Sequence, residues 1–250
     1  MLVIAELLGV PRELAPELRA WSQAIVKMYE VSPSREIEDV AIDAAEQFAS
    51  MIRDIARARA ARPEQDLISD LVAARHGSAR LSEDEVVASA VLLLKAGHEA
   101  SVNVFGNGLV SMLQLGLVPD LGHVALCVEE MLRFDTGLQL FERTATEDVT
   151  VGRVNVEKGH KIAALLGAAN RDPAVFDGAD SFVVTRDPNP HLAFGAGVHF
   201  CLGAPLARME LVESLTHLWA ELPGLHLVGD PVSRETFVLR GYTSVRVGTG

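Results

Sequence analysis

The feature that most constrains the fold is a long apolar segment, SEDEVVASAVLLLKAGHEASVNVFGNGLVSMLQL, at residues 82–115. Ser82 and Glu85 have the spacing of a capping box, which predicts the start of a helix. Apolar residues continue almost all round that helix, so we expect it to be buried on all sides in the middle of the protein. Gly97, His98 and Glu99 interrupt this pattern, because glycine and charge are both unfavourable in a buried helix. Such local inconsistencies often mark functional sites.

Helical periodicity also dominates the segments around this helix. Apolar residues at spacings of three and four predict helices over 11–29 and 37–60, the second ended by Pro63. A short helix is expected from Gln65 to His76, closed by Gly77.

The second half of the chain mixes helices with strands. The patterns predict a helix at 124–134, short strands and turns at 138–166, a long ordered loop at 170–190, a helix at 204–221, and strands and turns at 225–247. No repeat or low-complexity linker is present, so residues 1–250 are expected to form a single domain that is mainly α with a small β component.

Charge and cysteine content exclude several classes of function. The net charge is −12 without a cluster of Lys and Arg, which argues against nucleic acid or an anionic membrane as partner. The two cysteines form no CxxC motif, which excludes a disulfide scaffold and cysteine-rich zinc or iron–sulfur sites. The N-terminus is a poor signal peptide, and no uncharged stretch is long enough to span a bilayer. A cytoplasmic protein is therefore expected.

One cysteine lies in a glycine-rich loop, HLAFGAGVHFCLGAPLAR, at residues 191–208. Cys201 precedes a helix predicted to begin near Pro205, whose backbone N–H groups and dipole would stabilise a thiolate. Three glycines would let the backbone approach a flat partner, namely Gly195, Gly197 and Gly203. Phe194 could shield the sulfur, and His199 could donate a hydrogen bond to an anion. These residues favour haem iron, although most free cysteines are simply buried small hydrophobic residues.

The segment FGAGVHFCLGAPLAR closely resembles the cysteine-ligand loop of the cytochromes P450, Phe-Gly-x-Gly-x-His-x-Cys-x-Gly. This resemblance implies that Cys201 binds the iron of haem b as a thiolate, with the other motif residues shaping the proximal pocket. It also implies the C-terminal portion of the cytochrome P450 fold. The N-terminal MLVIAELLGVP resembles a mid-chain segment of bacterial members, so we expect the family's N-terminal helices and early sheet to be absent.

Other segments resemble the family in the same order. Glu130 and Arg133 match its Glu-x-x-Arg pair, which lies on one helix face. The alternative is a surface ion pair worth less than about 1 kcal/mol. Arg143 matches the arginine that pairs with a haem propionate, whereas Ser181 stands where a basic residue commonly joins the Glu–Arg pair.

The segment AGHEAS resembles the family's oxygen-binding helix but lacks its usual threonine. Ala100 follows Glu99, so Glu99, Ser101, an ordered water or a substrate hydroxyl would manage protons. Ala96 and Gly97 would leave room for oxygen. A minority of members, including hydroxylases of macrolide precursors, share this alanine, which suggests a hydroxyl-bearing polyketide or macrolide-like substrate. By the same resemblance, substrate-lining residues would be Leu138 and Leu140.

The resemblance implies a monooxygenase that inserts one oxygen atom into a C–H bond. Electrons would come from NAD(P)H through a ferredoxin and its reductase, because the chain has no GxGxxG fingerprint of its own. Two alternatives stay open. One is a catalytically impaired haem-binding protein or fragment, and the other is a peroxygenase driven by hydrogen peroxide.

Overall fold

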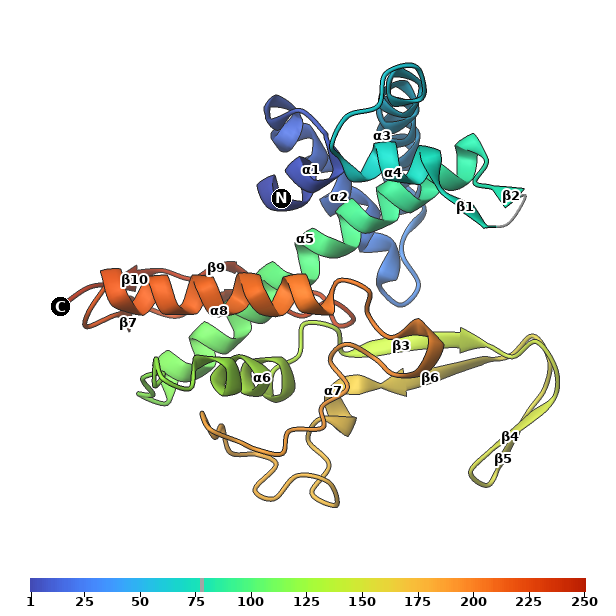
Figure 1. Cartoon of the computed structure of the whole chain (residues 1–250). Helices are drawn as coiled ribbons and strands as arrows, with labels where there is room; N and C mark the ends of the chain where they lie inside the picture. The colour runs from blue at the N-terminus through green and yellow to red at the C-terminus, as the bar shows by residue number, and fades with distance from the viewer. Residues whose placement is uncertain (77–78) are drawn as a thin grey trace. The chain divides into compact units, whose positions relative to one another are not determined.

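The computed structural model describes residues 1–76 and 79–250. They fall into two compact units, Met1–Glu99 and Ala100–Gly250, and each is considered by itself (Figure 1). The boundary lies within helix α5 (Glu83–Gln114). The expectation of a single domain stays a prediction. The helix expected from Gln65 to His76 is shorter than predicted, because it spans only Leu67–Ala73 and Arg75–His76 form a strand; its expected end at Gly77 lies outside the described residues.

The first unit is built from helices, as predicted. It contains α1 (Leu2–Leu8), α2 (Ala15–Val26) between 3-10 turns η1 (Arg12–Leu14) and η2 (Lys27–Tyr29), α3 (Arg35–Ala61), α4 (Leu67–Ala73) and the first part of α5. The antiparallel strands β1 (Arg75–His76) and β2 (Ala79–Arg80) complete it. Side-chain caps fix two of the starts: Ser34 accepts the Ile37 N–H at 3.4 Å, and Asp66 accepts the Ser69 N–H at 2.7 Å.

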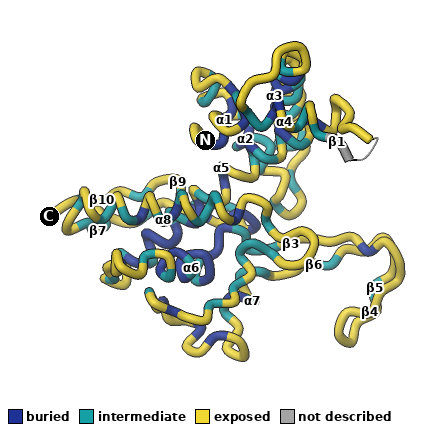
Figure 2. Tube along the Cα trace, in the orientation of Figure 1, coloured by how far each residue is buried: buried dark blue, intermediate teal, exposed yellow. Residues whose placement is uncertain are grey.

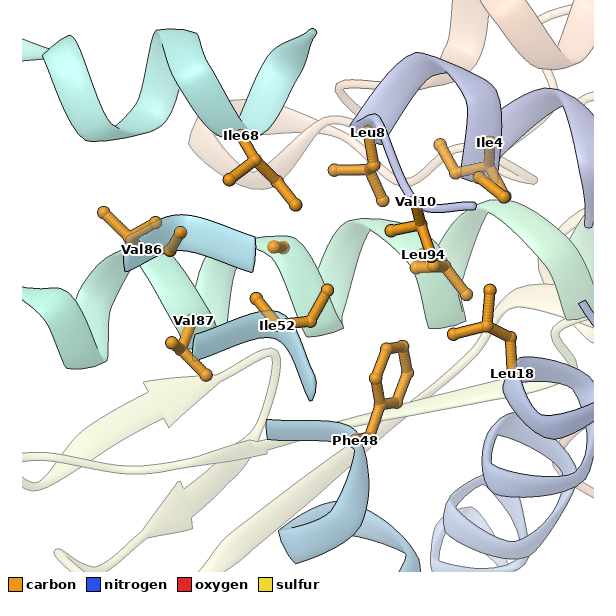
Figure 3. Close-up of a cluster of buried hydrophobic side chains, with 13 residues drawn as sticks. Ile4, Leu8, Val10, Leu18, Phe48, Ile52, Ile68, Val86, Val87 and Leu94 are labelled. Carbon is orange, nitrogen blue, oxygen red and sulfur yellow. The ribbon is translucent and has the colours of Figure 1, made fainter. Parts of the chain in front are cut away.

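A hydrophobic cluster joins these helices (Figure 3). Phe48 and Ile52 of α3 are fully buried, and the Phe48 ring stacks on Trp21 of α2 with centroids 5.6 Å apart. The remaining labelled residues come from the other helices and the turn after α1: Ile4, Leu8, Val10, Leu18, Ile68, Val86, Val87 and Leu94. The cluster accounts for the apolar spacing of three and four read from the sequence.

Helix α5 begins as predicted. The Ser82 N–H donates to Glu85 Oε2 at 2.7 Å, and the Glu85 N–H donates to Ser82 Oγ at 3.3 Å, which is a complete capping box. The prediction that α5 is buried on all sides is wrong, because Leu92 is 56% exposed and Val102 is 49% exposed. Buried, half-buried and exposed residues alternate along the helix (Figure 2).

None of the helices within residues 1–76 and 79–250 combines the length and the apolar character that a membrane span requires.

The helical part of the second unit rests on α6 (Val124–Phe134) and α8 (Ala204–Glu221), which lie side by side (Figure 1). Both helices have the boundaries expected from the sequence. Their apolar faces meet residues of α5 in a second buried cluster, which includes Val104, Met112, Val128, Leu132, Leu211 and Leu215. This cluster packs α8, the helix that follows the cysteine loop in sequence, against α6.

The β part consists of small antiparallel pairs. The described pairs are β3 (Leu140–Thr144) with β6 (Lys161–Leu165), β4 (Val149–Val151) with β5 (Val154–Val156), β7 (His226–Leu227) with β10 (Val247–Gly248), and β8 (Val232–Ser233) with β9 (Tyr242–Ser244). A single helical turn, α7 (Leu166–Ala169), leads into residues 170–190, which form the expected loop. The prediction of a mainly α fold with a small β component is confirmed.

Candidate functional site

Cys201 is held by backbone hydrogen bonds on both sides. Its N–H donates to the Phe194 carbonyl at 2.9 Å, and its own carbonyl accepts the Ala204 N–H at 3.2 Å. The loop therefore closes on itself just before α8 begins at Ala204. Cys201 as a residue is half-buried, while its backbone is fixed by these hydrogen bonds.

Two of the predicted glycines are required by the backbone. Gly195 has φ of 70° and Gly197 has φ of 72°, in the left-handed region that L side chains rarely adopt. A Cβ added at Gly197 would meet no atom within 4 Å, whereas one at Gly203 would lie 3.9 Å from the Cys201 sulfur. The loop thus turns sharply and leaves an open face.

Apolar side chains next to the cysteine in the chain are exposed. Val198 is 97% exposed, Leu202 is 84% exposed and Phe200 is 51% exposed, although all three favour burial. Among residues 1–76 and 79–250, no group of three or more His, Cys, Asp or Glu could hold a metal ion. One half-buried cysteine in a glycine-shaped loop with exposed apolar side chains fits haem, because the macrocycle itself supplies nitrogen ligands to the iron and the protein need supply only a thiolate.

The Phe194 ring is held by three neighbours. It packs edge-on against Phe200 with ring centroids 6.3 Å apart, and the Arg208 guanidinium lies 4.6 Å from its centroid. His191 approaches from the third side at 6.0 Å between centroids. His199 ends the short 3-10 turn η3 (Gly197–His199) and is exposed. The proposed shielding by Phe194 and hydrogen bonding by His199 stay predictions.

Glu130 and Arg133 form a fully buried ion pair on α6. The Arg133 Nε donates to Glu130 Oε2 at 2.7 Å, and its Nη2 donates to Glu130 Oε1 at 2.8 Å. Both side chains are 0% exposed, so this is not a surface ion pair. Arg133 also donates to three carbonyls of the 170–190 loop, those of Asn170, Ala179 and Ser181, at 2.8–2.9 Å. The pair therefore anchors the loop that leads to the cysteine.

A third charged residue joins this pair, contrary to the sequence prediction. Arg186 Nε donates to both Glu130 oxygens at 3.1 and 3.2 Å. The expectation that the basic partner is missing because Ser181 occupies its place is wrong: Ser181 supplies only a carbonyl, and the chain folds back at Arg186. The loop has no periodicity from which to infer that fold. The sequence offers one clue to the basic partner of Glu130, because residues 170–190 contain only two basic residues, Arg171 and Arg186.

Sequence reasoning also missed a second network beside the first. Glu129 accepts hydrogen bonds from Arg208 Nε at 2.6 Å and Arg208 Nη2 at 2.9 Å, and it lies 3.0 Å from His191 Nε2. Burial alone would raise the pKa of Glu129, but the hydrogen bonds from Arg208 and His191 outweigh it and lower the pKa to about 2. The signal was present in the quoted segment, because His191 and Arg208 stand at its two ends.

The predicted oxygen-site residues lie on α5. Glu99 is 3% exposed, and its Oε1 lies 3.9 Å from His98 Nε2. Ala96, Gly97 and Ala100 are exposed and Ser101 is half-buried. Gly97 also has a packing reason, since a Cβ there would lie 3.3 Å from the Ile4 side chain. The structure gives the local environment of these residues, and their proposed roles in oxygen and proton handling stay predictions.

The remaining predicted residues lie on or next to β3. Arg143 is exposed, donates to the Glu142 carbonyl at 2.9 Å and lies 4.6 Å from the Phe141 ring centroid. Leu138 forms an isolated antiparallel bridge with Leu239. Leu140 begins β3, opposite Leu165 of β6. Propionate binding by Arg143 and substrate lining by the two leucines stay predictions.

Comparison with known proteins points to one family. The family model described as "Cytochrome P450" matches residues 114–221. The chain is 37% identical to a biotin biosynthesis cytochrome P450 of Bacillus subtilis, over 90% of this chain and 58% of that protein. It is 38% identical to the 6-deoxyerythronolide B hydroxylase of Saccharopolyspora erythraea, over 96% of this chain and 60% of that protein.

A solved structure shows the same fold. The crystal structure of P450BioI in complex with an acyl carrier protein ligated to hexadec-9Z-enoic acid aligns with a TM-score of 0.93 and 34% identity. That alignment covers 99% of this chain and 65% of the other. The chain spans 58–64% of the length of the first curated relatives that it matches. The fold predicted from the cysteine loop is therefore confirmed.

Proposed function

Because the chain belongs to the cytochrome P450 family, we propose that it acts as a haem-thiolate monooxygenase on a small organic molecule. The observation that carries this proposal is the half-buried Cys201 in a loop whose backbone turns at Gly195 and Gly197. Haem b, when bound, supplies the chemistry that activates O2 for insertion into a C–H bond.

The residues of this chain would hold that group and control its surroundings. Cys201 would bind the iron as a thiolate, with the N-terminus of α8 favouring its negative charge. The left-handed backbone at Gly195 and Gly197 would let the loop approach the macrocycle. Val198 and Leu202 would exclude water from the sulfur by covering apolar surface of the macrocycle. Haem binding would thereby bury apolar side chains that are otherwise exposed.

Proton supply would differ from that of family members in which a threonine follows the acid, because in this chain Ala100 follows Glu99. Ala100 has no hydroxyl, so the groups next to it in α5 that can hold a proton are the Glu99 carboxyl and the Ser101 hydroxyl. A hydroxyl on the substrate would complete the route. We therefore propose a hydroxyl-bearing polyketide or macrolide-like substrate. Similarity to a 6-deoxyerythronolide B hydroxylase supports this class.

Electrons would come from a ferredoxin and its NAD(P)H-dependent reductase. This proposal rests on the sequence, which has no GxGxxG fingerprint for a nucleotide cofactor. Product formation should then require ferredoxin, reductase and NAD(P)H together. Turnover with hydrogen peroxide alone, at the same rate, would identify a peroxygenase instead.

The first experiment is the absorption spectrum of the reduced chain with haem and carbon monoxide. A strongly red-shifted Soret band is expected for the native chain and for Cys127→Ala, and its loss is expected for Cys201→Ala. Cys127 is the matched control because it is the other cysteine of the chain and is buried in the core of the second unit at 1% exposure. A native spectrum typical of a neutral or histidine ligand would refute the proposal and favour an impaired haem-binding protein.

The substrate class is tested by coupling. The ratio of product formed to NAD(P)H consumed should fall when a macrolide-like substrate loses the hydroxyl nearest the oxidised carbon. An Ala100→Thr variant should restore the ratio for the deoxy substrate, because it returns a hydroxyl to α5. Equal ratios for both substrates in the native chain would contradict the proposed role of the substrate hydroxyl.

A further inference from the structure

Three side chains from different segments meet beside the cysteine loop. Glu129 lies on α6, Arg208 lies on α8, and His191 lies in the segment that enters the loop. The Arg208 fork donates two hydrogen bonds to the Glu129 carboxylate, and His191 Nε2 lies 3.0 Å from its Oε2. The His191 side chain is only 3% exposed, and the hydrogen bonds that hold it go to Glu129 and Ala193 rather than to the Glu130 network.

The partners of His191 assign its protonation state. Its Nδ1 lies 3.2 Å from the Ala193 backbone nitrogen, which can only donate. Nδ1 must therefore accept, so the ring proton is on Nε2 and is donated to Glu129 Oε2. Both contacts are satisfied together only by the neutral Nε2–H form of the imidazole.

These contacts lead directly to the cysteine. The His191 ring and the Arg208 guanidinium both contact the Phe194 ring, and the Phe194 carbonyl accepts the Cys201 N–H at 2.9 Å. Between these points the side chains of Val198 and Leu202 are exposed and add little packing that would hold the loop. The position of Cys201 thus depends on where Phe194 is held.

We propose that His191, Glu129 and Arg208 form a latch that positions Cys201 for iron, with the neutral His191 ring as its central element. His191 acts through Phe194 and the Ala193 N–H, so it is a positioning residue. The functional part of this proposal rests on the proposed role of Cys201 as haem ligand. The positioning part concerns the chain alone and can be measured without haem.

Two substitutions separate the two hydrogen bonds of His191. His191→Asn keeps an acceptor for the Ala193 N–H but cannot reach Glu129, and His191→Gln keeps a donor for Glu129 but loses the local acceptor. In the haem-free chain, amide hydrogen exchange of Cys201 should quicken by about fivefold in either variant, the factor expected for one buried hydrogen bond. Exchange at Ala193 should quicken in His191→Gln alone.

The control is His217→Gln on α8, where the histidine is exposed. It should leave both exchange rates unchanged. Unchanged exchange at Cys201 in both His191 variants would overturn the latch, provided that the same samples show native unfolding midpoints. A variant that fails to fold is replaced by Glu129→Gln, which keeps the size of the side chain and removes its charge.

A haem-loaded measurement connects the latch to the ligand. In the reduced carbon monoxide complex, the His191 variants should show a larger share of the neutral-thiol band than the native chain at the same pH. Native-like spectra and native-like exchange would refute the latch while the monooxygenase proposal stands. Faster exchange in the variants, with no thiolate band even in the native chain, would leave the positioning contact established and refute the proposed function.

Discussion

Replacing Arg133 with methionine should destabilise the second unit severely. Arg133 donates five hydrogen bonds, two to Glu130 and one each to the carbonyls of Asn170, Ala179 and Ser181. Methionine retains the apolar volume of the side chain but none of these donors. The variant therefore leaves a buried carboxylate short of one cation and removes the Arg133 donor from three loop carbonyls, of which Ser181 keeps a hydrogen bond from Arg186 at 3.3 Å.

The expected loss follows from burial. Removing one partner of a buried ion pair costs about 3–5 kcal/mol, because the other charge stays uncompensated. Arg186 still donates to Glu130 and offsets part of this cost, whereas the carbonyls of Asn170 and Ala179, which lose their Arg133 donor, add to it. A loss of about 4 kcal/mol is therefore expected, compared with less than about 1 kcal/mol for an exposed pair.

The assay is urea unfolding followed by tryptophan fluorescence. Trp219 lies on α8 beside the buried cluster of the second unit, so a Trp21→Phe background makes the signal specific to that unit. Arg35→Met is the matched control, because the Arg35 side chain is 80% exposed and its ion pairs lie on the surface of α3. Arg133→Lys serves as a second variant if Arg133→Met does not fold.

A double variant tests the reasoning further. Glu130→Gln with Arg133→Met should lose less stability than the sum of the two single losses, because the double variant removes the orphaned charge. A loss below about 1 kcal/mol for Arg133→Met would refute the argument, because a pair of that strength is no stronger than an exposed one.

Three further predictions follow from buried polar groups. The pKa of Glu129 is lowered from 4.5 to about 2, so its carboxylate stabilises the fold above the unfolded pKa and that contribution is lost as the pH falls toward 2. In an acid titration, Glu129→Gln should lose less stability than the native chain between these values, and equal slopes would contradict the ion pair with Arg208. Burial raises the pKa of Cys127 to about 12, so iodoacetamide at neutral pH should leave Cys127 unlabelled in the folded chain, and a label found there by mass spectrometry would contradict this. Asn107 donates to two backbone carbonyls at 3.1 and 3.2 Å, so Asn107→Leu should cost about 1–3 kcal/mol in urea unfolding, and a loss of a few tenths would refute that role.

Regular periodicity made the helices predictable. The boundaries of α6 and α8 follow from apolar spacing and from the turn residues beside them, and the start of α5 follows from Ser82 and Glu85. The burial of α5 did not follow, because composition gives the apolar residues of a helix but not which of them a neighbour covers. Leu92 and Val102 are apolar and exposed for that reason.

The candidate site was likewise predicted from the sequence only in part. The cysteine loop and the Glu130–Arg133 pair were found because each resembles a motif of the cytochromes P450. Arg186 and His191 were not found, because each reaches α6 from irregular backbone more than fifty residues later in the chain. Contacts of that kind depend on how a loop folds back, which local patterns do not encode.

The β4–β5 hairpin has a consequence for proteolysis. Within residues 1–76 and 79–250 its strands pair only with each other, and Val149, Val151 and Val154 are exposed rather than packed. An isolated two-stranded hairpin is marginal in water, so this arm should open locally far more often than the helices unfold. Its turn contains Arg153, where trypsin cleaves. Limited digestion should therefore nick the chain at this arm first, and both fragments should stay associated through the β3–β6 pairing on either side of the cut.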